Sequence, residues 1–274
     1  MLALKWTGLV RGPRPLRGIR VLDLTRVIAA PVATRFLAGL GASVLRIDPP
    51  WWDEPGVVPD MTLGKRCARL DLQKSAGRAR FCRLLSQADI FVHGLRPGAL
   101  SRLGVDAELR RKIRPGLVDV SLNTYGWSGP WVNRRGFDSL VQMSSGIAEA
   151  GMRQLNRDRP APLPVQALDH ATGYLMAAAA IHGLINRLTR RSGSEWRTSL
   201  AATAAVLVGY PADRSAETLA PEQISDFIEK LELTTWGPAR RLKPPVSIED
   251  VPILWERPAT HLGIADAEFS DLFS

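Results

Sequence analysis

The feature that most constrains the fold is a regular alternation of short apolar runs with helical segments. Residues 19–24 form an apolar run typical of a strand, and the turn after it places Pro31 in the first turn of a helix that ends near Gly41. Residues 43–48 form a second strand, which two prolines end. Strand, helix and strand within about thirty residues predict a βαβ unit and therefore a parallel sheet.

The same pattern repeats further along the chain. Strands are expected over residues 68–72, 89–92 and 117–121, and a helix is expected over residues 75–86. This alternation predicts an α/β fold with an open, doubly wound, mostly parallel sheet of Rossmann-like type and helices on both faces. Ligands of such a sheet lie beyond the carboxyl ends of the strands. No G-x-G-x-x-G fingerprint follows the first strand and no Walker A sequence is present, so side chains and helix ends must hold any phosphate.

The charge balance favours an anionic ligand. The 274 residues carry a net charge of +9, most of it from arginine, and 45% are hydrophobic, as in a globular protein. A nucleotide, a phosphorylated cofactor or a nucleic acid would suit this charge. Arginine pairs at 110–111, 134–135, 190–191 and 240–241 are what a nucleic-acid binder would use, but no known motif accompanies them. We therefore expect no nucleic-acid partner.

The spacing of cysteines and histidines bears on metal binding and on the cellular compartment. Cys67 and Cys82 have neither metal-ligand nor disulfide-framework spacing, and the four histidines have no zinc-site spacing, so we expect no metal and a reducing compartment. The amino terminus lacks the apolar core of a signal peptide, and the apolar run 175–188 is too short to cross a bilayer. The expectation is a cytoplasmic protein without membrane association.

Basic side chains recur where the expected strands begin and end. Arg26 follows the first strand, Lys65 and Arg66 precede the third, and Arg96 and Arg102 follow the fourth. Any one of them is more simply a solvated surface charge. Their recurrence at loops on what should be one edge of the sheet is more informative, because arginine and lysine held there can clamp a diphosphate.

A single acid precedes an alanine-rich helix in the middle of the chain. Asp169 is expected at or near the N-terminus of a helix that runs through residues 175–184, where free N–H groups and the helix dipole favour an ionised carboxylate. The small residues Ala171, Thr172 and Gly173 leave room for a bulky group to approach. The residues alone allow two interpretations, an N-cap and a nucleophile toward an activated carbonyl, and the cap is the commoner role.

Two segments rich in turn residues precede this acid. The loop 123–130 has two glycines and aromatic anchors, and it is either a surface loop or one that covers a substrate. Residues 134–138 open a helix that continues through Ile147. Asp138 is then either a cap or a second carboxylate near Asp169.

Taken in order, these motifs resemble the class III CoA-transferases, the group that includes formyl-CoA transferase and carnitine CoA-transferase. The resemblance extends over roughly residues 18–200, and no single motif carries it alone. The matching segments are Val21–Pro31, Leu40–Pro49, Gly64–Asp71, Arg96–Leu100, Tyr125–Pro130, Gly136–Asp138 and Ala167–Gly173.

The resemblance implies a set of roles. Asp169 would be the nucleophile that attacks the donor thioester, forms an aspartyl anhydride and then an aspartyl-CoA thioester, and releases CoA to an acceptor carboxylate. The substrates would be an acyl-CoA and a carboxylic acid, with coenzyme A the only cofactor. The implied CoA contacts are Arg26, Val27, Lys65, Arg66 and Arg102, and the implied residues of the acyl side are Tyr125, Gly126, Arg135 and Asp138.

One position separates this chain from a related branch that racemises 2-methylacyl-CoA. That branch uses a histidine just before the aspartate of its Gly-x-Asp motif. Phe137 occupies this position here and has no proton to transfer, so CoA transfer is favoured over racemisation.

The resemblance also implies a division of the chain into three parts. Residues 1–205 would form the large α/β domain, 206–235 a short linker in place of the family's small domain, and 236–274 an extended C-terminal arm packed on the large domain. A short helix is expected over 221–231. Since the small domain helps to close the acyl pocket in the family's interlocked dimers, we expect a homodimer or a complex with a second CoA-transferase chain. The alternatives are a non-catalytic acyl-CoA-binding homologue and one subunit of a two-chain CoA-transferase.

Overall fold

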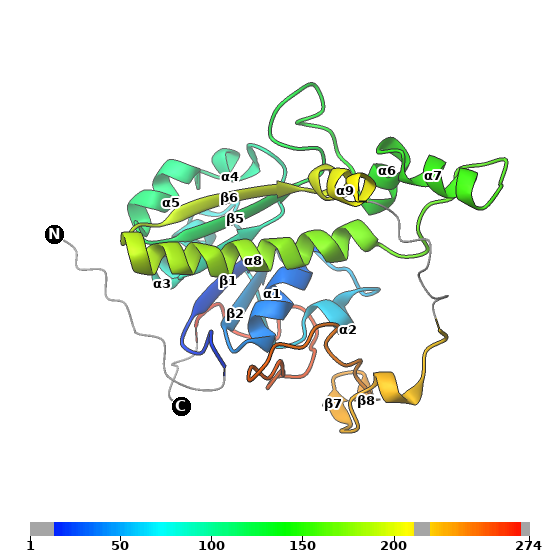
Figure 1. Ribbon diagram of the computed structural model, residues 1–274. Coiled ribbons are helices and arrows are strands. Elements are labelled where there is room, and N and C mark those ends of the chain that lie inside the picture. The colour runs from blue at the N-terminus through cyan, green and yellow to red at the C-terminus, as the bar shows by residue number, and fades with distance from the viewer. Residues whose placement is uncertain (1–13, 211–219, 270–274) are drawn as a thin grey trace.

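A six-stranded parallel sheet forms the centre of the molecule, as the computed structural model of residues 14–210 and 220–269 shows (Figure 1). The strand order is β3-β2-β1-β4-β5-β6, so the direction of winding reverses between β1 and β4. This order confirms the predicted doubly wound, Rossmann-like sheet. The strands are β1 (Arg20–Leu24), β2 (Ser43–Asp48), β3 (Lys65–Arg69), β4 (Ile90–His93), β5 (Val118–Asn123) and β6 (Ser194–Ser199).

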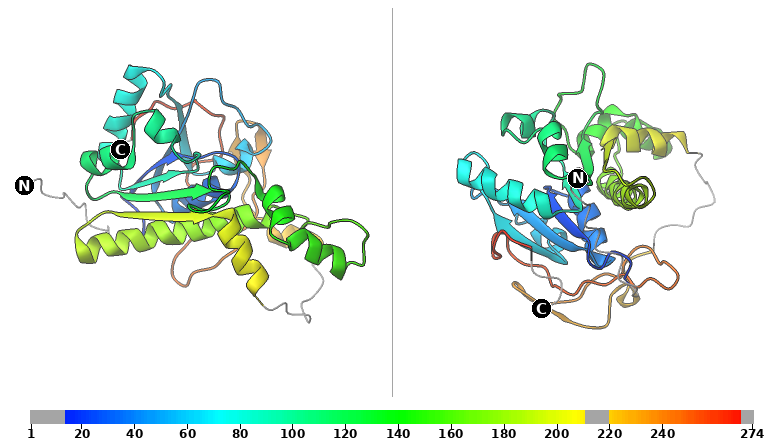
Figure 2. Two further views of the ribbon diagram at one scale, coloured as in Figure 1. Left: turned by 90° about the horizontal axis from the view of Figure 1, so that it is seen from above. Right: turned by 90° about the vertical axis from the view of Figure 1, so that its left-hand side faces the viewer.

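Helices cover both faces of the sheet, as expected (Figure 2). Val21, Val92 and Val120 point to one face and pack against α1 (Ala29–Gly39) and α8 (Ala167–Arg190). Leu22 and Phe91 point to the other face, which α3 (Ser75–Gln87), α4 (Ala99–Arg102) and α5 (Ala107–Ile113) cover. Alternate residues of one strand therefore serve two cores, as a sheet buried on both faces requires.

The crossing of α1 and α8 depends on one glycine. A Cβ at Gly173 would lie 2.5 Å from the carbonyl oxygen of Ala29 and 2.7 Å from Cβ of Val32. Thr172 is also buried, with its hydroxyl 2.6 Å from that of Thr203. The expectation of open space was therefore wrong for Thr172 and Gly173, because helix α1 fills the space beside Gly173 and Thr172 meets Thr203, whereas Ala171 is exposed.

Several elements differ from the sequence expectations. The third strand begins at Lys65 and not at residue 68, because the charged Lys65 is buried and paired and so hides the start of the strand. The expected helix through Ile147 is two helices, α6 (Asp138–Ser144) and α7 (Ile147–Gln154), separated by Gly146 with φ 87°. Strand β6 and helix α9 (Leu200–Gly209) were not anticipated, since the edge strand β6 alternates exposed charged residues with half-buried ones.

The helix expected over 221–231 is also absent. A single 3-10 turn, η1 (Ile224–Asp226), leads into a hairpin of β7 (Glu232–Thr234) and β8 (Gly237–Ala239). A further short helix, α2 (Val58–Met61), lies between β2 and β3.

Residues 254–265 lie against the edge of the sheet and α1. The Trp255 indole Nε1–H donates to the carbonyl of Arg35 at 2.8 Å, and the Ala265 N–H donates to the carbonyl of Cys67 at 3.0 Å. Within the described ranges, no helix combines the length and apolar character that crossing a membrane requires.

Candidate active site

Asp169 lies at the edge of the sheet where the strands end. Helix α1 follows β1 and so begins at this carboxyl edge, and α8 leads into β6 and begins at the same edge. Gly173 packs against Ala29, the first residue of α1. Asp169 is four residues earlier, about one helical turn further out, beside the β1–α1 loop.

The N-cap interpretation of Asp169 was wrong. The cap position of α8 is Gln166, which makes no side-chain capping bond, and Asp169 lies inside the first turn. The Asp169 backbone N–H donates to Oδ2 of Asp138 at 2.9 Å. One of the free N–H groups at this helix end is thus satisfied by a second carboxylate, which is one of the two roles considered for Asp138.

Asp138 is held in turn by the residues around it. It is buried, and its Oδ1 accepts a hydrogen bond from Nε2 of Gln142, which also donates to the carbonyl of Val165 at 3.2 Å. The Leu163 N–H donates to Oε1 of Gln142 at 2.7 Å. The Gln142 amide therefore fixes Asp138 from one side while Asp169 fixes it from the other.

Burial, followed by the negative charge of Asp138, raises the pKa of Asp169 to about 7. The expectation that the helix dipole keeps this carboxylate ionised is therefore corrected. A shift of this size corresponds to about 4 kcal/mol. A dipole contributes only about 1 kcal/mol or less at a helix end. Desolvation outweighs it, and near neutral pH the protonated and ionised forms are both populated.

The β1–α1 loop has an unusual backbone conformation at Val27. Its φ is 65°, in the left-handed region that a β-branched residue adopts only under constraint. The constraint comes from Glu54, whose Oε2 accepts the Val27 N–H at 2.9 Å and the Trp52 indole N–H at 3.1 Å. Glu54 and Trp52 were not singled out from the sequence, and the only signal was their place directly after the second strand.

Arg26 in the same loop stacks on Trp52. Its guanidinium carbon is 4.3 Å from the centre of the indole ring, and its Nε is 4.0 Å from Oδ1 of Asp48. Burial is the main cause that lowers the pKa of Arg26, and the charges of Asp48 and Glu54 oppose it. Part of the side chain remains exposed, so its donors can reach a ligand.

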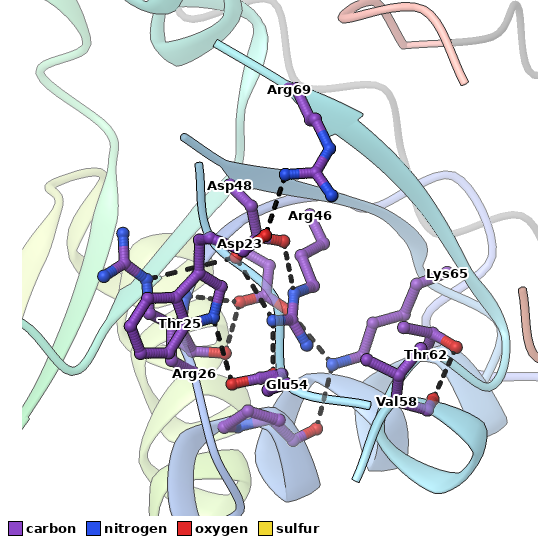
Figure 3. Close-up of polar contacts among 12 residues, drawn as sticks. Asp23, Thr25, Arg26, Arg46, Asp48, Glu54, Val58, Thr62, Lys65 and Arg69 are labelled. Atoms are coloured by element: carbon purple, nitrogen blue, oxygen red, sulfur yellow. Dashed lines mark hydrogen bonds and ion pairs between the residues drawn. The ribbon is translucent and has the colours of Figure 1, made fainter. Parts of the chain in front are cut away.

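The Lys65 backbone begins β3 at the opposite edge of the sheet, contrary to expectation, but its side chain reaches beneath the β1–α1 loop. Its ammonium is fully buried and donates to Oδ2 of Asp23 and to the carbonyl of Pro31, both at 3.0 Å. Burial lowers the pKa of Lys65. Beside it, Arg46 pairs with Asp48 at 2.8 Å (Figure 3). This ion network lies beneath the β1–α1 loop and supports it from inside.

The other predicted basic residues divide between the two ends of the sheet. Arg66 is half-buried near the start of β3, away from the carboxyl edge. Arg96 and Arg102 are exposed after β4, and the Arg102 guanidinium folds over Gly98. Because β4 neighbours β1, the structure brings Arg26, Arg96 and Arg102 to the crevice where the winding reverses.

The residues expected on the acyl side follow β5. Tyr125 packs edge-on against Trp131 with ring centres 5.0 Å apart. Gly126 has φ 98°, and its N–H donates to Oδ1 of Asn123 at 2.8 Å. Arg135 is exposed. Of this group, the structure brings Asp138 into direct contact with Asp169.

Together these features define a doubly wound α/β protein with a paired-carboxylate site and a basic loop at the carboxyl edge of its sheet. The chain belongs to CoA-transferase family III, whose family model matches residues 16–227. The resemblance read from the motifs is thereby confirmed.

Curated relatives carry acyl-CoA transferase names. The chain is 32% identical over 192 residues to an acetyl-coenzyme A transferase of Hypoxylon pulicicidum, covering 68% of this chain and 32% of that protein. It is 31% identical over 188 residues to a probable fatty acyl-CoA transferase of Mycobacterium tuberculosis, covering 64% and 47%. It is 32% identical over 206 residues to mouse succinyl-CoA:glutarate CoA-transferase, covering 69% and 47%. The matched region thus spans less than half the length of each of these relatives.

Solved structures agree with this relationship. A crystal structure of the M. tuberculosis protein superposes with a TM-score of 0.66 at 29% identity, covering 71% of this chain and 56% of that one. A CAIB/BAIF family protein from Brucella suis superposes with a TM-score of 0.64 at 26% identity, covering 71% and 55%.

Proposed function

We propose that the protein transfers CoA from an acyl-CoA thioester to a carboxylic acid, with Asp169 as the nucleophile. The observation that carries the proposal is the buried carboxyl group of Asp169 in the first turn of α8, whose backbone N–H donates to the neighbouring carboxylate of Asp138 at the carboxyl edge of the sheet. Family membership supplies the reaction class, and the named relatives support acyl-CoA and carboxylate substrates.

The reaction requires two exchanges at Asp169. A carboxylate oxygen of Asp169 attacks the thioester carbonyl carbon, the C–S bond breaks, and CoA leaves as thiolate from a mixed anhydride. The thiolate then attacks Cγ of Asp169, which forms an aspartyl-CoA thioester and releases the donor acid. The acceptor carboxylate attacks Cγ of that thioester and displaces the CoA thiolate, which leaves a second mixed anhydride. The thiolate finally attacks the acceptor carbonyl carbon of this anhydride, so that the acceptor acyl-CoA forms and the Asp169 carboxylate is freed.

The neighbourhood of Asp169 favours this chemistry in a specific way. A carboxylate whose pKa is about 7 is more basic than an ordinary one, and therefore a stronger nucleophile once ionised. Asp138 accepts the Asp169 backbone N–H and so fixes the start of α8 without bonding to the attacking oxygens. We assign Asp138 the role of a positioning residue.

The CoA phosphates would lie at the crevice between β1 and β4. Arg26 and Arg102 offer guanidinium donors there, and α1 begins beside them without a side-chain cap. Helix N-termini and arginine forks suit phosphate oxygens. Val27 would contact CoA through its constrained backbone, whereas Lys65 would act indirectly by holding Asp23 beneath the loop.

Mass spectrometry tests the proposal directly. After incubation with an acyl-CoA, the protein should carry a CoA adduct on the peptide that contains Asp169, and the Asp169→Ala variant should carry none. Transfer of CoA between acids at the same rate in Asp169→Ala would exclude Asp169 as the nucleophile.

An exposed apolar surface favours a partner chain, and we propose that the active assembly is a homodimer or a complex with a second CoA-transferase chain. Helix α8 has no Asp, Glu, Lys or Arg between Asp169 and Arg187, and its outward Leu175 and Ile185 are both about half exposed. Helix α9 adds Val206 at 61% exposure. Large exposed apolar patches mark association sites.

Light scattering on the purified chain tests this surface. The parent chain should form a dimer, or a stable complex when the partner chain is added, and Leu175→Glu with Ile185→Glu should remain monomeric. A parent chain that remains monomeric alone and in the presence of every second CoA-transferase chain from the same source would refute the partner.

A further inference from the structure

A cavity lies beside the first turn of α8, on the side that faces α1. It has a volume of about 760 Å³, within the range of small-molecule sites. Its inner wall comes from α1 and α8, with Phe36, His170 and Tyr174, and its outer wall from residues 227–245 together with Trp255. Asp169 does not line it, so the cavity is separate from the nucleophile although His170 is the next residue.

Aromatic rings from several segments line this cavity and are held in place. Phe36 and Tyr174 meet edge-on with ring centres 5.3 Å apart. Trp255 is fixed by its hydrogen bond to the Arg35 carbonyl, and Trp236 meets His261 edge-on at 4.6 Å. Rings fixed in this way form a preformed apolar lining, which favours the apolar body of a ligand over water.

The charge of the lining is positive and incompletely balanced. Arg35 pairs with Asp60, and Arg241 pairs with Glu232 at 2.8 Å. Arg240 and Lys243 also line the cavity, at its solvent-exposed outer wall, and neither has an ion-pair partner within residues 14–210 and 220–269. Burial lowers the pKa of His170, which favours its neutral form, so the imidazole adds no further positive charge. An apolar cavity with two unbalanced cations at its wall selects an anionic group attached to an apolar body.

We propose that this cavity binds an organic monocarboxylate with a medium-length apolar chain, whose carboxylate pairs with Arg240 and Lys243. The binding follows from the cavity itself. Its role, to hold the acid substrate beside the first turn of α8, rests on the proposed transferase function.

Calorimetry with octanoate on the full chain tests the binding without requiring catalysis. Octanoate should bind with one-site stoichiometry, and octanol, which has the same chain without the charge, should bind roughly tenfold more weakly. Coenzyme A, which has phosphates but no apolar chain, should not compete. Equal affinity for octanol, or displacement of octanoate by coenzyme A alone, would overturn the proposal.

Matched variants locate the site. Arg240→Gln with Lys243→Gln should weaken octanoate binding about tenfold, whereas Lys112→Gln with Arg190→Gln removes the same charge elsewhere and should leave it unchanged. Ala239→Trp should fill the cavity and abolish binding while circular dichroism shows the parent fold. Unaltered octanoate affinity in Arg240→Gln with Lys243→Gln and in Ala239→Trp would refute the site. CoA transfer that fails while octanoate still binds would count against the transferase alone.

Discussion

The backbone N–H of Asp169 donates to Oδ2 of Asp138 at 2.9 Å, although 31 residues separate the two in sequence. This bond joins α6 to the first turn of α8 and holds two carboxyl groups in one buried site. Because like charges in a buried site oppose ionisation, Asp138 adds to the effect of burial on the pKa of Asp169. The protonation of the proposed nucleophile is therefore set partly by a residue on another helix.

Replacing Asp138 should change the pH dependence of Asp169. In Asp138→Asn the amide oxygen can still accept the Asp169 N–H, but the negative charge is gone, so the pKa of Asp169 should fall below about 7. Burial is the larger cause, and the pKa should therefore remain above that of an ordinary aspartate. The yield of CoA adduct measured from pH 5 to 8 should show its midpoint at lower pH in the variant. Asp158→Asn, an exposed control, should leave the midpoint in place, and an unmoved midpoint in Asp138→Asn would contradict the assignment.

Asp169 should also make the stability of the fold depend on pH. Its pKa is raised in the folded protein, so its contribution to stability is present below about pH 4, where both states are protonated, and is lost as the pH rises through about 7. Ionising this group in the folded state costs up to about 4 kcal/mol. Asp169→Asn should therefore be more stable than the parent at pH 9, with a much smaller difference at pH 5. Urea unfolding at the two values measures this. An equal difference at both would show that Asp169 ionises freely in the folded state.

Sequence patterns predicted the sheet because its strands are apolar runs and its helices have helical periodicity. Val21 and Leu22 serve two different cores, so both are apolar, and a continuous apolar run of this kind is visible in the sequence alone. Lys65 misled the strand assignment because a buried lysine looks like a loop residue until its partner Asp23 is known. That partner lies on a non-adjacent strand, and only the strand order brings them together.

The sequence singled out the two carboxyl residues that the structure brings together, but it did not reveal how deeply they are buried. Asp169 and Asp138 were both singled out, but desolvation depends on what packs around a group, and no local pattern carries that information. The constraint on Val27 likewise comes from Glu54, which lies beyond the second strand. The cavity lined by His170 has its other wall in a chain segment some seventy residues later in the sequence, so no local pattern predicts it.

Glu54 should prove essential to the conformation of the β1–α1 loop. It accepts the N–H groups of Val27 and Trp52 and pairs with the buried Arg46, one of whose terminal nitrogens already lacks a partner. Glu54→Gln leaves that buried charge less compensated and should cost roughly 3 kcal/mol of unfolding free energy. The amide has a single acceptor oxygen for donors on two sides, and the buried cation Arg46 has the stronger claim on it. The Val27 N–H then loses its acceptor, so Val27 should relax from its left-handed conformation, and Arg26 should lose its place over Trp52.

Calorimetric titration with CoA separates this local effect from general destabilisation. Glu54→Gln should bind CoA more weakly at a temperature where circular dichroism shows it fully folded. The exposed Glu249→Gln removes the same charge and should match the parent in both measurements. Reduced stability with unchanged CoA affinity would mean that Glu54 supports the fold but does not position the loop.

The last prediction concerns the contact on which the position of Asp169 depends. A methyl group at Gly173 would meet the Ala29 carbonyl at 2.5 Å and Val32 at 2.7 Å, so Gly173→Ala must push α8 away from α1. Overpacking of this kind costs about 1–3 kcal/mol. Because Asp169 lies one turn from the contact, the same displacement should move its carboxyl group relative to the β1–α1 loop and lower the yield of CoA adduct in the folded protein. Gly209→Ala, at the end of α9 with no atom within 4 Å of the added methyl, should change neither quantity. If Gly173→Ala lowered stability but formed the adduct at the parental rate, the geometry of the α1–α8 crossing would not be what places the nucleophile.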